Sequence, residues 1–132
     1  MTYKVIQWAT GGVGQAAISN IVAHPELELV GCWVNSAEKA GMDAAEISGL
    51  PAVGVAATRD AEALLALEAD CVLYSPVIAD RELVIRLLAS GKNVVTPLGW
   101  FYPGSRDVSD LEAACAAGGT TLHGTGIHPG GI

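Results

Sequence analysis

The sequence predicts one α/β domain in which helices cover both faces of a mainly parallel β-sheet, the doubly wound arrangement. Short apolar segments alternate with amphipathic ones along all 132 residues, and this alternation is typical of parallel strands joined by crossover helices. Hydrophobic residues make up 51% of the chain and charged residues 16%, which suits strands buried on both faces. The 16 glycines form clusters, as expected where the backbone closely approaches a ligand or another strand.

A βαβ unit is predicted at the start of the chain. A strand is expected over Tyr3–Ala9, because β-favouring residues there precede a glycine-rich turn. Apolar residues then recur at helical spacing over Val13–Ala23, and Pro25 ends that helix. A second strand follows over Leu27–Val34. A unit of this length, about 30 residues, should have a right-handed crossover.

The rest of the chain is predicted to continue the alternation as one domain over residues 1–132. The further expected elements are a short helix at Asp43–Ser48, an edge strand at Val53–Ala56, a helix at Asp60–Leu67, a strand at Cys71–Tyr74, a helix at Arg81–Ala89, a strand at Asn93–Thr96, a helix from Ser109 to about Ala117 and a strand at Thr120–His123. For these six strands we expect the order 3-2-1-4-5-6, with the ligand crevice at the carboxyl end of the first strand.

Charge and cysteine content exclude several kinds of partner. The net charge of −7 and the pI of about 4.7 argue against binding to nucleic acid or to an anionic membrane. The apolar segments are too short for a membrane helix, and Gln7 interrupts the first one too early for a signal peptide. The three cysteines form no CxxC spacing, so we expect buried, reduced thiols in a cytoplasmic protein.

A glycine motif carries the main functional prediction. The segment Ala9-Thr10-Gly11-Gly12-Val13-Gly14 matches G-x-G-x-x-G with alanine in the first place, and it lies between a strand and a helix of a βαβ unit. Gly11 would let the backbone approach a pyrophosphate, and Gly14 would let the helix pack on the strand. The helix N-terminus offers N–H groups and a partial positive charge to phosphate. We therefore place a dinucleotide at Gly11, Gly12, Val13 and Gly14; the alternative is a purely structural glycine turn.

The end of the second strand bears on the choice of cofactor. NAD-selective sites often carry Asp or Glu there, where it binds the ribose 2′-hydroxyl. In this chain Asn35 and Ser36 follow the strand, and Lys39 lies close behind them. This arrangement tolerates a 2′-phosphate, so we expect NADP rather than NAD, although Glu38 could reach a ribose hydroxyl. The alternative is an ordinary turn with local side-chain hydrogen bonds.

Other strand ends supply further candidate residues. Ser75 and Pro76, and likewise Thr96, are expected to border the crevice; the alternative is a simple strand-end turn. The aromatic run Trp100–Tyr102 is interpreted as the wall of a substrate pocket, as a docking surface, or as a local cluster. His123 and His128 are too few ligands for zinc, so no metal site is predicted. Either histidine could be a proton donor, but no catalytic residue is assigned.

Three segments carry a resemblance to a known family: Val5–Gly14, Gly91–Thr96 and Gly124–Gly130. Together they resemble the N-terminal NAD(P)-binding part of dihydrodipicolinate-reductase-like proteins. Within that family, the chain looks most like 2,4-diaminopentanoate dehydrogenases and native amine dehydrogenases. The resemblance spans essentially the whole chain, and its motifs are specific in combination rather than singly.

The resemblance implies a Rossmann domain that binds NAD(P)H and works in hydride transfer to or from a C=N bond. It also implies that a following α+β domain, absent here, supplies the substrate pocket and the dimer contacts, so we expect this chain to be inactive alone. Ser75, Pro76 and Thr96 would line the nicotinamide side. Acidic residues of the diaminopentanoate branch are replaced here by Pro97–Trp100, so no carboxylate receives a catalytic role.

Two other function classes remain open at this point. The same fold serves in non-enzymatic nucleotide sensors, because a fold alone does not fix a function. A CoA-binding domain also pairs an N-terminal glycine turn with similar later strands. An S-adenosylmethionine methyltransferase is disfavoured, because it too usually carries an acid at the end of the second strand.

Overall fold

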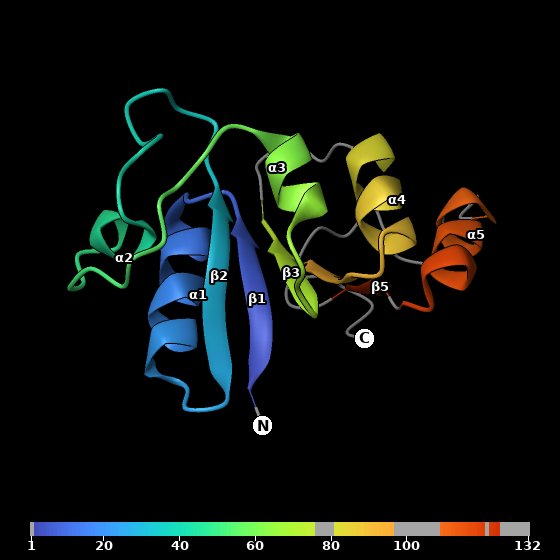
Figure 1. The fold of residues 1–132 in the computed structure, drawn as a ribbon, viewed down its shortest axis with the longest axis horizontal. Helices are drawn as coiled ribbons and strands as arrows, with labels where there is room; N and C mark the ends of the chain where they lie inside the picture. Colours follow the sequence, from blue (N-terminus) through green and yellow to red (C-terminus); the bar gives the residue numbers. More distant parts are fainter. Residues whose placement is uncertain (1, 76–80, 97–108, 121, 125–132) are drawn as a thin grey trace.

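The computed structural model of the chain describes residues 2–75, 81–96, 109–120 and 122–124, and these residues form a five-stranded, all-parallel sheet flanked by helices (Figure 1). The strands are β1 (Tyr3–Trp8), β2 (Leu27–Trp33), β3 (Cys71–Tyr74), β4 (Asn93–Thr96) and β5 (Leu122–Gly124). The helices are α1 (Gly12–Ala23), α2 (Ala44–Ile47), α3 (Ala61–Ala66), α4 (Arg81–Ala89) and α5 (Ser109–Gly118). The predicted α/β class is confirmed.

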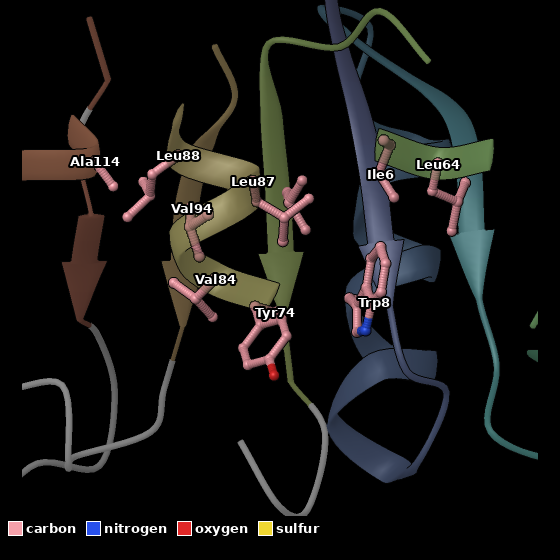
Figure 2. Packing of buried hydrophobic residues seen from close by; sticks show 10 residues of the cluster. Ile6, Trp8, Leu64, Tyr74, Val84, Leu87, Leu88, Val94 and Ala114 are labelled. Carbon is pink, nitrogen blue, oxygen red and sulfur yellow. The ribbon is translucent and has the colours of Figure 1, made fainter. Parts of the chain in front are cut away.

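The helices cover the sheet from both faces, which the alternation of side chains along β1 makes clear. Val5 belongs to a buried cluster with residues of α1 and α2, whereas Ile6 and Trp8 belong to a second cluster with residues of α3, α4 and α5 (Figure 2). Successive side chains of a strand point to opposite faces, so these two clusters are the two cores of a doubly wound domain.

One predicted strand is wrong. Val53–Ala56 forms no strand in the structure, so the described order is β2-β1-β3-β4-β5. This is the expected order 3-2-1-4-5-6 without its third strand. The physical reason is Asp43, whose carboxylate accepts hydrogen bonds from the backbone N–H groups of Val53, Gly54 and Val55 at 2.8–3.2 Å. Those N–H groups are therefore not available to β2. The chain reaches the edge of β2 only at Thr58, through one parallel bridge to Trp33.

Two glycines allow helices to approach their neighbours closely. A Cβ at Gly31 of β2 would lie 2.8 Å from a methyl group of Leu64 in α3. A Cβ at Gly118 of α5 would collide with the backbone carbonyl of Leu88 in α4. Gly31 is buried and Gly118 half-buried, and both lie within regular elements rather than in turns, so their glycines serve packing.

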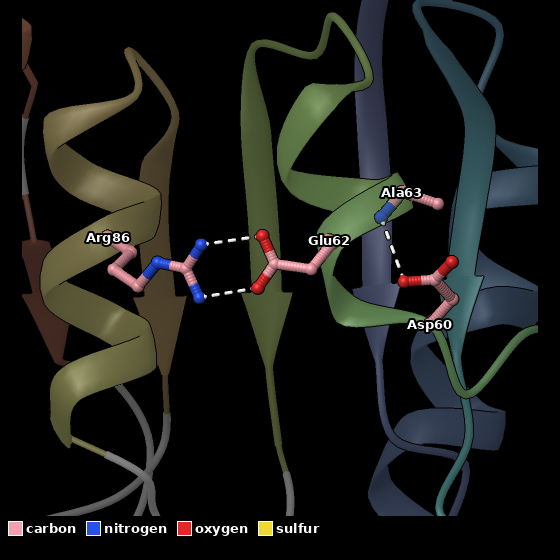
Figure 3. Close-up of polar contacts among 4 residues, drawn as sticks. All are labelled: Asp60, Glu62, Ala63 and Arg86. Atoms are coloured by element: carbon pink, nitrogen blue, oxygen red, sulfur yellow. Dashed lines mark hydrogen bonds and ion pairs between the residues drawn. The ribbon is translucent and has the colours of Figure 1, made fainter.

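Polar contacts at the helix ends agree with the predicted boundaries. The Asp60 carboxylate accepts from the N–H of Ala63 at 3.2 Å and caps α3 (Figure 3). Arg86 of α4 forms two hydrogen bonds of 2.7 Å with the carboxylate of Glu62 in α3. Both side chains of this ion pair are more than half exposed, so it orients the two helices while contributing little to stability.

Candidate dinucleotide site

The glycine motif forms a tight turn between β1 and α1. Ala9 is buried, adopts a φ of +83° and donates its N–H to the carbonyl of Trp33 at 2.9 Å. Gly11 is the N-cap of α1, with φ −69° and ψ −170°. No acidic side chain lies in the first turn of α1. The first N–H groups of a helix have no intrahelical partner, so this helix end is suited to an anion.

The three glycines of the motif have different surroundings. A Cβ at Gly14 would collide with the carbonyl oxygen of Ala9, so packing requires glycine at that position. A Cβ at Gly11 or at Gly12 would meet nothing within 4 Å, and both residues are exposed. Neither has a positive φ. The fold itself therefore requires no glycine at these two positions, whereas a ligand lying against the backbone would.

Lys39 reaches the same turn from the chain beyond β2. Its Nζ donates to the carbonyl oxygen and to the hydroxyl of Thr10, both at 3.1 Å. Gln15 Nε2 also donates to the Thr10 carbonyl, at 2.9 Å. Burial raises the pKa of Cys32 to about 12, and the positive charge of Lys39 opposes that rise. The ammonium group thus lies beside the turn and near the end of β2.

The proposed ribose residues lie in one turn after β2. Asn35 is exposed and Ser36 is half-buried. The Ser36 hydroxyl accepts from the N–H of Glu38 at 3.1 Å, and its carbonyl accepts from the N–H of Ala40 at 3.2 Å. The turn directly follows the end of β2, where the carbonyl of Trp33 accepts a hydrogen bond from the N–H of Ala9. The structure therefore brings this turn and the glycine motif to the same edge of the sheet.

Ser75 also lies against the glycine motif. Its N–H donates to the Trp8 carbonyl at 3.0 Å, and its hydroxyl accepts from Gln7 Nε2 at 2.9 Å. Thr96, at the end of β4, is fully buried and lies two strands away from β1 in the sheet. Pro76 falls outside the described residues. The structure thus places Ser75 at the motif and leaves Thr96 without an exposed surface.

Sequence reasoning missed two residues of this region, Gln7 and Thr10. Gln7 is fully buried in β1 and donates to the carbonyl of Ala9 at 3.0 Å as well as to Ser75. Thr10 is 4% exposed, and its hydroxyl accepts a hydrogen bond from Lys39. A signal for Gln7 existed: it is the one polar residue inside the apolar run Val5–Ala9, directly before the glycine turn. Buried polar side chains in strands are costly unless they have partners.

A separate groove lies along the outer edge of β2. It has a volume of about 490 Å³ and is lined by Val22, Leu27–Val30 and Val53–Val55. These β2 residues precede the strand end that contacts Ala9, so the groove and the glycine turn are distinct.

The aromatic run and the two histidines belong to the C-terminal third of the chain. Trp100–Tyr102 and His128 fall outside the described residues, and His123 lies in β5.

Among the described residues, no three His, Cys, Asp or Glu side chains gather as a possible metal site. All three cysteines are free, with Cys32 buried and the other two half-buried. Within the described part, no helix has the length and apolar character to span a membrane.

Comparison with curated proteins shows a clear relative. No protein-family model matches the chain. An amine dehydrogenase from Streptomyces virginiae is 35% identical over 96% of this chain, which corresponds to 38% of that protein. A 4-hydroxy-tetrahydrodipicolinate reductase from Synechococcus elongatus is 38% identical over 58% of the chain and 28% of its own length. The chain thus spans well under half the length of the curated relatives it matches.

Comparison with solved structures agrees. The structure of amine dehydrogenase from Mycobacterium smegmatis matches 96% of this chain and 40% of its own, with a TM-score of 0.81 and 25% identity. Biliverdin reductase from Synechocystis, solved with biliverdin and NADP+, matches 93% of this chain and 37% of its own, with a TM-score of 0.68 and 22% identity, which shows a shared Rossmann fold. The resemblance indicated by the sequence motifs is therefore confirmed: over nearly its whole length, this chain is similar to part of the amine dehydrogenases.

Proposed function

We propose that the chain is the dinucleotide-binding domain of an NAD(P)-dependent oxidoreductase, with the cofactor pyrophosphate lying over Gly11 and Gly12. The observation that carries the proposal is the open space at these two glycines, on a helix N-terminus without acidic residues. A pyrophosphate against the backbone N–H groups explains why side chains are absent there. Val13 and Gly14 complete the turn.

The adenosine ribose is assigned to the turn after β2. Asn35 is exposed and offers hydrogen bonds, Ser36 lies beside it, and Lys39 brings a positive charge to Thr10. With no carboxylate at the first positions after the strand, a 2′-phosphate is tolerated, so NADP is preferred over NAD. Since Lys39 already holds Thr10, it would serve the phosphates from the loop side.

The nicotinamide side is assigned to the ends of β3 and β4. Ser75, Pro76 and Thr96 are the residues in question, and the burial of Thr96 gives it a supporting role at the strand end. A bound nicotinamide supplies the hydride chemistry; the protein residues bind and orient it. By similarity to the amine dehydrogenase, we assign the parent protein to reactions at a C=N or CH–NH2 group. Catalysis would require the remaining part of such a protein, so this chain alone should not turn over substrate.

The proposal is tested by titrating the chain with NADPH, NADH and CoA while following tryptophan fluorescence. Trp8 directly precedes the turn and is 1% exposed, so a bound dihydronicotinamide should quench it by energy transfer. We expect saturable quenching by NADPH and weaker quenching by NADH. Saturation by CoA alone would instead indicate a CoA-binding domain.

Gly12→Asp makes this test specific for the phosphate position. An Asp side chain at the first position of α1 has free space and favours the helix dipole, so the melting temperature should hold or rise. The same charge should repel the pyrophosphate and weaken NADPH binding at least about tenfold. Ala16→Asp, on the exposed part of the same helix, is the charge-matched control and should bind normally. Equal affinity in both variants would contradict the proposed site.

A further inference from the structure

Gln7 is a buried side chain that joins two strand ends. Its Nε2 donates to the carbonyl of Ala9 at 3.0 Å and to the hydroxyl of Ser75 at 2.9 Å. Ala9 opens the glycine turn, and Ser75 is the first residue after β3. The Ser75 hydroxyl in turn lies 3.4 Å from the Trp8 carbonyl, to which it donates. One amide group thus fixes the spacing between the two loops.

The unpaired oxygen of the Gln7 amide indicates that this side chain does more than stabilise the fold. Its Oε1 is buried and has no hydrogen-bond partner among the described residues. Leaving a buried acceptor unpaired is unfavourable, whereas an apolar residue of similar shape carries no such cost. The amide cannot be turned over to relieve this, because its oxygen would then face the carbonyl of Ala9. The NH2 group must therefore do something that an apolar residue cannot.

The orientation of the Ala9 carbonyl depends on a hydrogen bond from outside the turn. Ala9 adopts a φ of +83°, a region that an alanine occupies only under constraint. Its carbonyl oxygen accepts from Gln7 Nε2 at 3.0 Å and lies against Gly14, where a Cβ would collide with it. A donor at the position of Gln7 Nε2 keeps the peptide in this orientation, and this orientation determines where the N–H groups of the turn point.

We propose that Gln7 is a positioning residue that couples the glycine turn to the end of β3 and so sets the gap between the pyrophosphate and nicotinamide sides. The inference rests on the proposed function for its consequence in binding, but the coupling itself belongs to the free chain. Gln7 acts through Ala9 and Ser75 and does not itself touch the dinucleotide.

The binding test is a double-mutant cycle with Gln7→Met and Ser75→Ala, measured as the dissociation constant for NADPH. Methionine has a similar shape but no donor, so it removes the unpaired Oε1 and also the bond to the Ala9 carbonyl. These two effects oppose one another, and the melting temperature should change little. Each single variant should weaken binding at least about fivefold, and the double variant should be no weaker than the poorer single one. Ser75→Thr retains a hydroxyl and should bind like the wild type. Multiplying effects would mean that Gln7 and Ser75 act independently on binding and would overturn the proposed coupling.

A second measurement on the free chain separates this inference from the proposed function. In 1H–15N spectra without ligand, Ser75→Ala should shift the amide resonances of Gly11 and Gly12, while Ser19→Ala, a hydroxyl on α1 that bonds to Gln15, should not. Shifted glycine amides in a chain that binds no NADPH would support the coupling and refute the proposed function. Unchanged glycine amides would overturn the coupling, whatever the chain binds.

Discussion

Ala9 concentrates the local strain of the site. It stands where the glycine motif has its first glycine, and its φ of +83° makes it the one non-glycine with positive φ among the described residues. A left-handed conformation costs an L-residue about 1–2 kcal/mol. The sequence alone showed that the motif departs from glycine at this position, but it did not show that the backbone retains the glycine conformation.

Substitutions at Ala9 should reveal this strain. Ala9→Gly relieves the φ but loses a buried methyl group, worth about 0.8 kcal/mol, so the free energy of unfolding should change by less than about 1 kcal/mol. Ala9→Val adds a β-branched side chain at positive φ in a buried place and should lose at least about 2 kcal/mol. Urea denaturation measures both. Comparable losses in the two variants would show that Ala9 is not strained.

Asp43 provides a pH-dependent prediction at the same scale. Burial alone would raise its pKa, but backbone N–H groups, those of Val53 and Gly54 foremost, hold it below the ordinary value of 3.8. A lowered folded-state pKa contributes stability that is complete above the unfolded pKa and is lost as the pH falls through the folded pKa. The melting temperature of Asp43→Asn should therefore lie below that of the wild type at pH 7, and the gap should close at pH values below 3.8. A gap that stays constant down to pH 2 would contradict this role.

At the scale of elements, the periodicity of the sequence predicted those strands and helices whose bounds depend on residues close together in the chain. The strands Cys71–Tyr74 and Asn93–Thr96 and the helix Arg81–Ala89 have the predicted bounds, because each has its own apolar pattern and end signal. Val53–Ala56 has the composition of a strand, yet its N–H groups bond to a carboxylate ten and more residues earlier. The hydrophobic periodicity of a short segment does not report hydrogen bonds to residues that far away in the sequence. The same holds for Gln7 and Ser75, which are 68 residues apart.

The contact between α4 and α5 gives a prediction at this scale. Gly118→Ala places a methyl group against the Leu88 carbonyl, and a backbone atom of a packed helix cannot easily move away. We expect a loss of about 1–3 kcal/mol in the free energy of unfolding, despite the better helix propensity of alanine. Ala116→Met adds a larger side chain to an exposed position of α5 and should change it by less than about 0.5 kcal/mol. If Gly118→Ala is stabilising, the two helices are not in close contact.

The whole molecule combines an acidic net charge with the proposed local site for a dinucleotide. The net charge is −7, so attraction of phosphate has to come from oriented N–H groups and the nearby Lys39 rather than from the overall field. The sheet order explains why the site is assembled at all: β1 lies between β2 and β3, so the turn after β1 meets residues from both neighbours. Alternation of elements was sufficient to predict this edge of the sheet. The hydrogen bonds that fix it depend on side-chain directions that only the folded chain defines.

The dinucleotide is proposed to bind across the glycine turn and the turn after β2. Amide chemical-shift mapping of the 15N-labelled chain during titration with NADPH tests it most directly. We predict that the largest shifts occur at Gly11 and Gly12, followed by Asn35, Ser36 and Ser75, and that they saturate together with one dissociation constant. Shifts concentrated instead at the β2 groove, around Val53–Val55, would contradict this placement of the dinucleotide. So would unchanged amide resonances of Gly11 and Gly12 at saturating NADPH.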